Sequence, residues 1–192
     1  MTFIYLHGFN SKGNPESDKL KELSKLGSII TLNYDSFATY DSILDDLGKK
    51  YKKTIHDNID NDIAVAGTSL GGFWAATFGN EYQFPTILIN PSITPKKTLK
   101  RHVGVTYQNY VSGETRMLSM DVPASYPDIP KSPLYLILLD DGDDVINPVE
   151  TEAYFTENRV IKFEGGSHRF EHMAESLPHI QSYLNNLETI HY

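Results

Sequence analysis

The chain has 192 residues, of which 40% are hydrophobic and 22% are charged, a composition typical of one soluble globular domain rather than of a disordered chain. Its net charge of −8 makes nucleic acid an unfavourable partner, because phosphate backbones are also negative. The chain contains no cysteine, which excludes disulfides, thiolate metal sites and a cysteine nucleophile and suits a reducing cytoplasm.

The start of the chain, MTFIYLHGFN, has neither the basic leader nor the long apolar core of a signal peptide. No apolar run approaches the roughly 18 residues that a membrane-spanning helix needs. We therefore expect a cytoplasmic protein without a membrane partner. The oligomeric state is left open.

Short apolar runs alternate along the chain with longer amphipathic stretches. Near-continuous apolar runs are typical of strands covered on both faces, and apolar residues at helical spacing are typical of helices on the surface of a sheet. The predicted strands span residues 3–6, 28–32, 63–66, 86–89, 134–139 and 160–163. The predicted helices span residues 15–26, 38–56, 70–79, 148–158 and 175–187. The alternation predicts one α/β domain over 1–192, a three-layer sandwich around six mostly parallel strands.

Residues 92–132 interrupt this alternation. Roughly forty residues are too many for a simple connection between two elements. We expect a small excursion over the active-site edge of the sheet, with one short helix at 96–101. Prolines lie in or beside this segment at Pro91, Pro95, Pro123, Pro127, Pro130 and Pro133.

The first predicted strand leads directly into His7-Gly8-Phe9-Asn10-Ser11. A loop at this edge of the sheet can present a backbone N–H to the site, and Phe9 is the candidate donor because it follows Gly8. The alternative is a plain turn between a strand and a helix. We assign His7 to the architecture of the loop and not to proton transfer.

The third strand is followed by Gly67-Thr68-Ser69-Leu70-Gly71 and then by a predicted helix. This is the G-x-S-x-G pattern in the context that it requires, where a sharp turn lifts a serine out of the sheet. Glycines on either side avoid collisions in such a turn. The N–H of Leu70 at the start of the helix could stabilise an oxyanion. The alternatives are a structural turn and a phosphate-binding loop. This segment has neither the G-x-G-x-x-G spacing nor the Walker lysine of a phosphate-binding loop.

The fifth strand ends in an acidic turn. A Ser-His-acid site needs one carboxylate here, buried against an imidazole, while the others could be solvated or cap a helix. A Ca²⁺ or Mg²⁺ site is the alternative, but the spacing does not match an EF-hand loop. The candidates are Asp140, Asp141, Asp143 and Asp144.

The last strand ends in Gly165-Gly166-Ser167, and His168 follows within this glycine turn. His168 is therefore free to bend back over the sheet toward both the serine and the acid. His172 follows four residues later and suggests a zinc pair, but no third ligand is evident. The remaining histidines lie on predicted helices or in polar stretches: His56, His102, His179 and His191.

Serine, acid and histidine occur in the order found in α/β hydrolases, and the chain resembles that superfamily. It is similar in particular to the small bacterial YqiA-type esterases. The segments that carry the resemblance are IYLHGFNSKG, AGTSLGGFWAATFG, INPSITPKKTL, DDGDDVI and FEGGSHRFE, which span nearly the whole chain.

The resemblance implies a minimal α/β-hydrolase fold with strand order 2-1-3-4-5-6. It implies Ser69 as nucleophile, His168 as base, Asp143 as acid and the N–H groups of Phe9 and Leu70 as oxyanion donors. Asp144 stays an alternative to Asp143, because two aspartates follow Gly142. The implied activity is that of a serine carboxylesterase acting on small or short-acyl esters, without cofactor or metal.

The natural substrate cannot be read from the sequence. The same site could serve a thioesterase, an amidase or an acyltransferase, and an idle hydrolase fold could act as a binding module. Aromatic residues could line an apolar pocket, although aromatic side chains more commonly belong to the core. These residues are Phe73, Trp74, Tyr107, Tyr110 and Tyr126.

Overall fold

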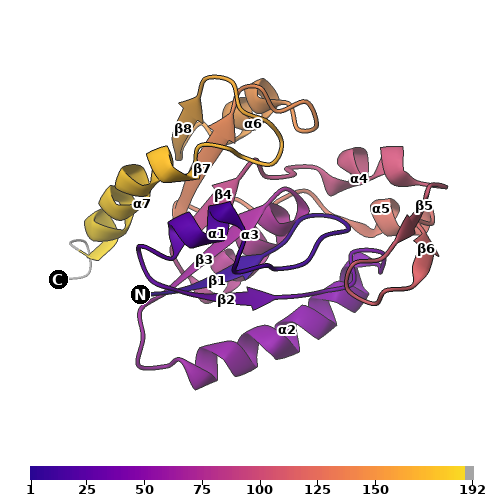
Figure 1. The fold of residues 1–192 in the computed structure, drawn as a ribbon, viewed down its shortest axis with the longest axis horizontal. Helices are drawn as coiled ribbons and strands as arrows, with labels where there is room; N and C mark the ends of the chain where they lie inside the picture. Colours follow the sequence, from indigo (N-terminus) through magenta and orange to yellow (C-terminus); the bar gives the residue numbers. More distant parts are fainter. Residues whose placement is uncertain (189–192) are drawn as a thin grey trace.

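The computed structural model describes residues 1–188, so His191 lies outside the described residues. Six parallel strands form one sheet in the order β2-β1-β3-β4-β7-β8 (Figure 1). They are β1 (Thr2–Leu6), β2 (Ser28–Leu32), β3 (Ile63–Thr68), β4 (Thr86–Ile89), β7 (Tyr135–Asp140) and β8 (Arg159–Phe163). Taken in chain order without the two short strands described below, this is the predicted order 2-1-3-4-5-6, which is confirmed.

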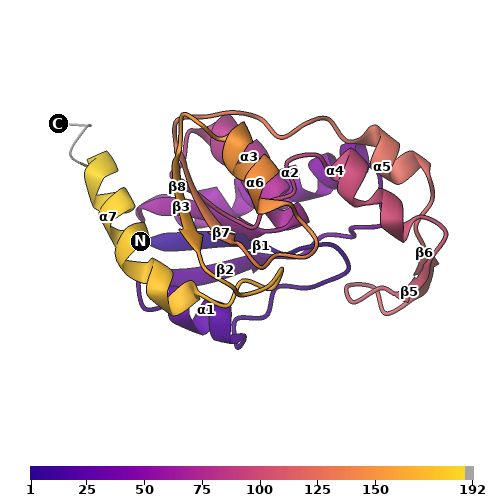
Figure 2. The ribbon, with the colours of Figure 1, turned by 90° about the horizontal axis from the view of Figure 1, so that it is seen from above.

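Helices cover both faces of the sheet, as Figure 2 shows. One face packs against α2 (Tyr40–Asp57), α3 (Leu70–Tyr82) and α6 (Pro148–Tyr154). The other packs against α1 (Asp18–Leu23) and α7 (Met173–Glu188). Successive strand residues alternate between these two cores, with Ile4 on the first and Phe3 on the second. Every central strand is therefore buried on both faces, which accounts for the near-continuous apolar runs of the sequence.

The helices predicted at 15–26, 38–56, 70–79, 148–158 and 175–187 are observed at Asp18–Leu23, Tyr40–Asp57, Leu70–Tyr82, Pro148–Tyr154 and Met173–Glu188. Two of the ends that differ have a clear local reason. Helix α1 begins at Asp18 rather than Pro15, because the Ser17 side chain caps it by accepting the N–H of Leu20. Helix α3 continues past Gly79 to Tyr82. A Cβ at Gly79 would lie 1.9 Å from Oγ1 of Thr86, so this glycine allows the helix to approach β4 and does not end it.

The excursion contains two short helical elements followed by a hairpin and a helix. They are α4 (Pro95–Thr98), a 3₁₀ turn (Lys100–His102), β5 (Thr106–Gln108), β6 (Thr115–Met117) and α5 (Asp121–Ser125). The helix predicted at 96–101 is thus divided into α4 and the 3₁₀ turn, and the antiparallel β5–β6 hairpin was not predicted.

The hairpin is held beyond the carboxyl ends of β1 and β2 (Figure 1). Asp35, which follows β2, accepts a hydrogen bond from Asn109 Nδ2 at 2.7 Å and pairs with Arg116 at 3.1 Å. The N–H of Tyr110 donates to Oδ1 of Asn10. None of the helices in residues 1–188 is both long and apolar enough to cross a bilayer.

Candidate active site

Ser69 occupies a strained turn between β3 and α3, with φ of 58° and ψ of −122°. The chain can make this turn because both flanking positions lack a side chain. A Cβ at Gly67 would lie 2.1 Å from the carbonyl oxygen of Gly71, and a Cβ at Gly71 would lie 2.1 Å from that of Leu6. The strain at Ser69 presents its hydroxyl at the carboxyl edge of the sheet.

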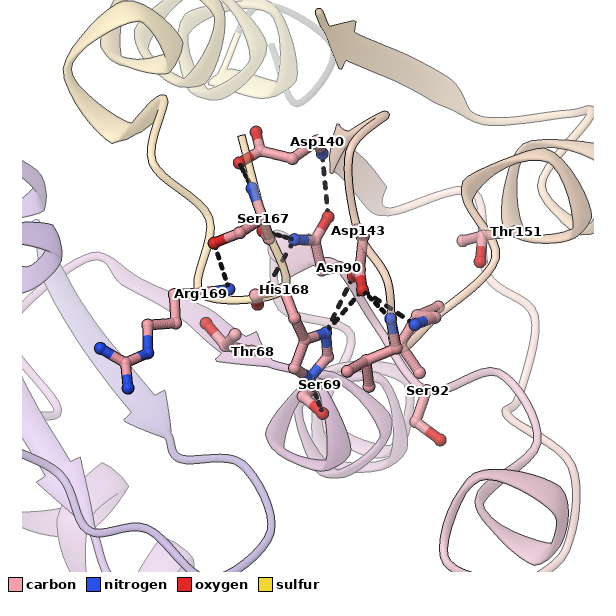
Figure 3. A network of polar contacts seen from close by, with 12 residues as sticks. Thr68, Ser69, Asn90, Ser92, Asp140, Asp143, Thr151, Ser167, His168 and Arg169 are labelled. Atoms are coloured by element: carbon pink, nitrogen blue, oxygen red, sulfur yellow. Dashed lines mark hydrogen bonds and ion pairs between the residues drawn. The ribbon is translucent and has the colours of Figure 1, made fainter. Parts of the chain in front are cut away.

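The structure brings Ser69, His168 and Asp143 together from three different loops (Figure 3). His168 Nε2 lies 2.9 Å from Ser69 Oγ, and His168 Nδ1 lies 2.8 Å from Asp143 Oδ2. The ring is thus placed to accept the proton of the serine hydroxyl at Nε2 while Nδ1–H donates to the carboxylate.

Burial and backbone hydrogen bonds hold the carboxylate of Asp143 in place independently of the imidazole. Its side chain is 1% exposed, and Oδ1 accepts the N–H groups of Val145 at 2.8 Å and Ile146 at 2.9 Å. Asp144, the alternative acid, is exposed and forms no hydrogen bond or ion pair with His168. The geometry therefore favours Asp143 of the two.

Asp140 holds the loop that carries His168. Its fully buried carboxylate accepts the N–H groups of Ser167 at 3.1 Å and Glu171 at 2.8 Å, on either side of His168. The loop approaches closely because Gly166 has a φ of +71° and no Cβ, which would otherwise lie 2.0 Å from Oδ2 of Asp140. Asp141 adds a hydrogen bond from the N–H of Gly165.

Asn90 joins the same network and was missed by the sequence analysis. It follows β4 with a φ of 41°. Its Nδ2 donates to the carbonyl oxygen of Ser167 at 3.1 Å, and its Oδ1 accepts the N–H of Asp140 at 3.0 Å. The one available signal was its position directly after an apolar strand and before Pro91, at the edge where the other candidates lie.

His172 pairs with the buried carboxylate of Asp140. Its Nδ1 lies 2.8 Å from Asp140 Oδ1, and its ring stacks on Phe163. This hydrogen bond and the negative charge of Asp140 raise the pKa of His172 above its ordinary value. Among residues 1–188, no group of three or more metal-ligating side chains is gathered closely enough to hold a metal ion.

Two backbone N–H groups are positioned as candidate oxyanion donors. Leu70 is the first residue of α3, so its N–H has no carbonyl partner within the helix. Phe9 follows Gly8, where a Cβ would lie 3.4 Å from Cβ of Ser69. In the described part of the chain, neither N–H makes a backbone hydrogen bond outside the regular elements or a bond to a side chain.

His7 supports this loop as a buried neutral ring. Its Nε2 accepts the N–H of Tyr34 at 3.3 Å, and its Nδ1–H donates to the carbonyl oxygen of Gly8 at 2.8 Å. Burial lowers the pKa of His7 to about 4. Both ring nitrogens are thus occupied by backbone partners.

A cleft of about 1060 Å³ opens over Ser69 and His168, and Phe9 and Leu70 also line it. None of the five aromatic residues considered from the sequence is among the lining residues that the structure describes. Three are buried in the core, Tyr110 is exposed, and Tyr107 packs against Phe9. The three core residues are Phe73, Trp74 and Tyr126.

The parallel sheet, the serine turn and the helices on both faces define the α/β-hydrolase fold. Solved structures agree: the chain matches Est1E from Butyrivibrio proteoclasticus with a TM-score of 0.72 at 18% identity, over 100% of this chain and 88% of Est1E. It matches XC6422 from Xanthomonas campestris, described as a serine hydrolase without a lid, with a TM-score of 0.63 at 13% identity, over 97% and 81% of the two chains.

Within this fold the chain belongs to the uncharacterised protein family UPF0227, which it matches over residues 2–185. A UPF0227 protein from Shewanella woodyi is 24% identical over 94% of this chain and 97% of the relative. The UPF0227 protein YcfP from Escherichia coli O9:H4 is 22% identical over the same shares.

Proposed function

We propose that the protein is a serine carboxylesterase that cleaves small or short-acyl esters through Ser69, His168 and Asp143. The observation that carries the proposal is the continuous contact from hydroxyl to imidazole to carboxylate, with distances of 2.9 and 2.8 Å. A serine is a weak nucleophile unless a base takes its proton, and an oriented imidazole is such a base.

The proposed reaction has two halves. Ser69 Oγ attacks the ester carbonyl while His168 Nε2 takes the hydroxyl proton. The resulting oxyanion accepts hydrogen bonds from the N–H groups of Phe9 and Leu70. The C–O bond to the alcohol then breaks, and His168 returns the proton to the departing alkoxide. Water then attacks the acyl-enzyme while His168 Nε2 takes one of its protons. The C–O bond to Ser69 Oγ breaks, the acid is released, and His168 returns the proton to Ser69 Oγ. Throughout, Asp143 stabilises the imidazolium.

The proposed substrate bond is an oxygen ester. Similar folds include a monoacylglycerol lipase from Paleococcus ferrophilus and an esterase from Pyrobaculum calidifontis, and Est1E has been solved with ferulic acid. These names favour an oxygen ester over a thioester or an amide. A complete Ser-His-Asp set argues against an idle fold that only binds a partner, and the preference for small acyl groups rests on the similarity to small esterases.

The test is hydrolysis of p-nitrophenyl butyrate together with labelling by a fluorophosphonate probe. We expect Ser69→Ala to lose both, with a rate reduction of about 10⁴-fold or more. Ser42→Ala, an exposed serine on α2, is the matched control and should behave as the wild type. Wild-type protein that neither turns over nor labels would favour the binding module, and a parallel series of thioesters and amides would identify another acyl transfer.

A further inference from the structure

A lysine lies at the nucleophile turn without a role in the proposed reaction. Lys19 is on α1, and its Nζ donates to Oγ1 of Thr68 at 3.1 Å. Thr68 directly precedes Ser69, and its hydroxyl also accepts from the hydroxyl of Tyr5 at 2.9 Å. Lys19, Thr68, Tyr5 and Ser69 all line the cleft, so a positive charge stands at the wall beside the nucleophile.

This ammonium group lacks a carboxylate partner. Among the ion pairs of residues 1–188, none includes Lys19. Burial lowers the pKa of Lys19 to about 8, an effect that the charge of Asp140 partly opposes. Holding an ammonium in such a position costs free energy unless an anion compensates it. An unpaired cation in a cleft beside a nucleophile therefore points to a ligand group of negative charge.

A second cation lies on the same side of the site. Arg169 directly follows His168, lines the cleft and makes no ion pair within the described chain. In Figure 3, the side chain of Arg169 and Thr68 lie on one side of the Ser69–His168 pair and Ser92 lies on the other. Lys19 contacts Thr68, and both cations line the cleft.

None of the acidic residues that line the cleft forms an ion pair with Lys19 or Arg169 in residues 1–188. Glu22 pairs with Lys25 at 2.6 Å, and Asp18 and Glu171 form no ion pair in residues 1–188 although both line the cleft. Cations in this cleft are also unexpected from composition, because the net charge of the chain is −8. Their position at the site is therefore local and not a consequence of a basic surface.

We propose that Lys19, assisted by Arg169, binds an anionic group of the substrate, so that the preferred esters carry a carboxylate or a phosphate near the scissile bond. The inference deepens the proposed esterase function and rests on it. The competing interpretation is that Lys19 only supports Thr68 and the nucleophile turn. A supporting role would affect charged and neutral substrates equally, whereas an anion subsite affects the charged substrate alone.

The experiment compares esters of similar size that differ in charge. Mono-p-nitrophenyl succinate places a carboxylate in the acyl part, and p-nitrophenyl butyrate is its neutral counterpart. For the alcohol part, 3-acetoxybenzoate is compared with 3-acetoxybenzamide. Wild type should favour the anionic member of at least one pair, and inhibition by inorganic phosphate at constant ionic strength would extend the subsite to phosphate.

Lys19→Met should raise KM for the favoured anionic ester by about 10- to 100-fold, the scale of a lost charged hydrogen bond. Its effect on the neutral ester should stay within about threefold, and Lys19→Arg should restore part of the preference. Arg169→Gln should have a smaller effect of the same kind. Lys96→Met, at an exposed position on α4 outside the cleft lining, is the matched control.

Two results would overturn the subsite while leaving the esterase intact: no preference for either anionic ester in the wild type, or an equal loss on charged and neutral esters in Lys19→Met. A binding measurement separates the subsite from the chemistry. Monomethyl succinate should shift NMR signals of the Ser69→Ala protein, and adding Lys19→Met should abolish the shift. If the wild type is inactive but still shows this Lys19-dependent shift, the esterase proposal is refuted and the anion site is supported. If the shift is absent, the anion site is refuted.

Discussion

Asp143→Asn tests the proposed acid by replacing one carboxylate oxygen with an NH₂ group of nearly the same size and shape. The two N–H groups of Val145 and Ile146 point at Oδ1, so the amide oxygen of the variant must take that position. The amide NH₂ then faces Nδ1 of His168, where Oδ2 stood at 2.8 Å. The amide NH₂ can only donate, so a hydrogen bond to it requires Nδ1 to be the acceptor. The neutral ring then carries its proton on Nε2. That tautomer cannot take the proton of Ser69.

The expected loss in kcat/KM is about 10⁴-fold, as for the equivalent change of tautomer in other Ser-His-Asp sites, or about 5 kcal/mol of transition-state stabilisation. The assay is hydrolysis of p-nitrophenyl butyrate at pH 8, with thermal unfolding to show that the variant folds. Asp144→Asn removes the same charge at the adjacent exposed position and should change the rate by less than about threefold. A loss below tenfold in Asp143→Asn, or a larger loss in Asp144→Asn, would refute this reasoning.

Two further predictions concern stability. Gly71→Ala places a Cβ 2.1 Å from the backbone oxygen of Leu6 and should lower the free energy of unfolding by more than about 2 kcal/mol in urea titrations; Gly48→Ala on α2, with nothing within 4 Å of the added Cβ, should not destabilise, and equal effects would show that the turn can relax. His7 has a pKa of about 4 when folded against 6.5 as its ordinary value, so the unfolded chain binds the extra proton between these values and stability falls as the pH drops from 6.5 to 4. The loss in the free energy of unfolding that this proton binding causes reaches about 3 kcal/mol at low pH. In urea titrations, the stability of the wild type relative to His7→Gln should therefore be lower at pH 4.5 than at pH 7. A difference independent of pH would contradict the neutral buried ring.

The central sheet could be predicted because burial on both faces leaves a direct mark on the sequence. Residues such as Ile137 and Leu138 face opposite cores, so both must be apolar and the run is continuous. Parallel pairing followed from the helices between the strands, and the strand order followed from the resemblance to a known fold. Helix ends were harder to predict. In the sequence, Gly79 is typical of a helix end, but in the structure it is a glycine because Thr86 of the neighbouring strand leaves no room for a Cβ.

The hairpin of the excursion left no comparable signal. Strands β5 and β6 have three residues each, and only the central residue of each is even half-buried. Their position depends on Asp35, which reaches Asn109 and Arg116 across more than seventy residues of sequence. Contacts of this range cannot be read from local periodicity. For the same reason the sequence analysis assigned no role to Lys19, because its contact with Thr68 exists only once α1 packs against the sheet.

The aspartates of the 140–144 turn illustrate what separates a motif from a site. Because all four residues are aspartates, the sequence does not distinguish them. The structure distinguishes them by the N–H groups and the histidine rings that each carboxylate contacts. Asp140 pairs with His172 and fixes the backbone on both sides of His168, whereas Asp143 meets the His168 ring itself. The two carboxylates thus divide two tasks, since one holds the loop and the other orients the imidazole. A residue that holds the loop can influence the proposed proton transfer without contacting any reacting atom, and only the folded arrangement tells it apart from the acid.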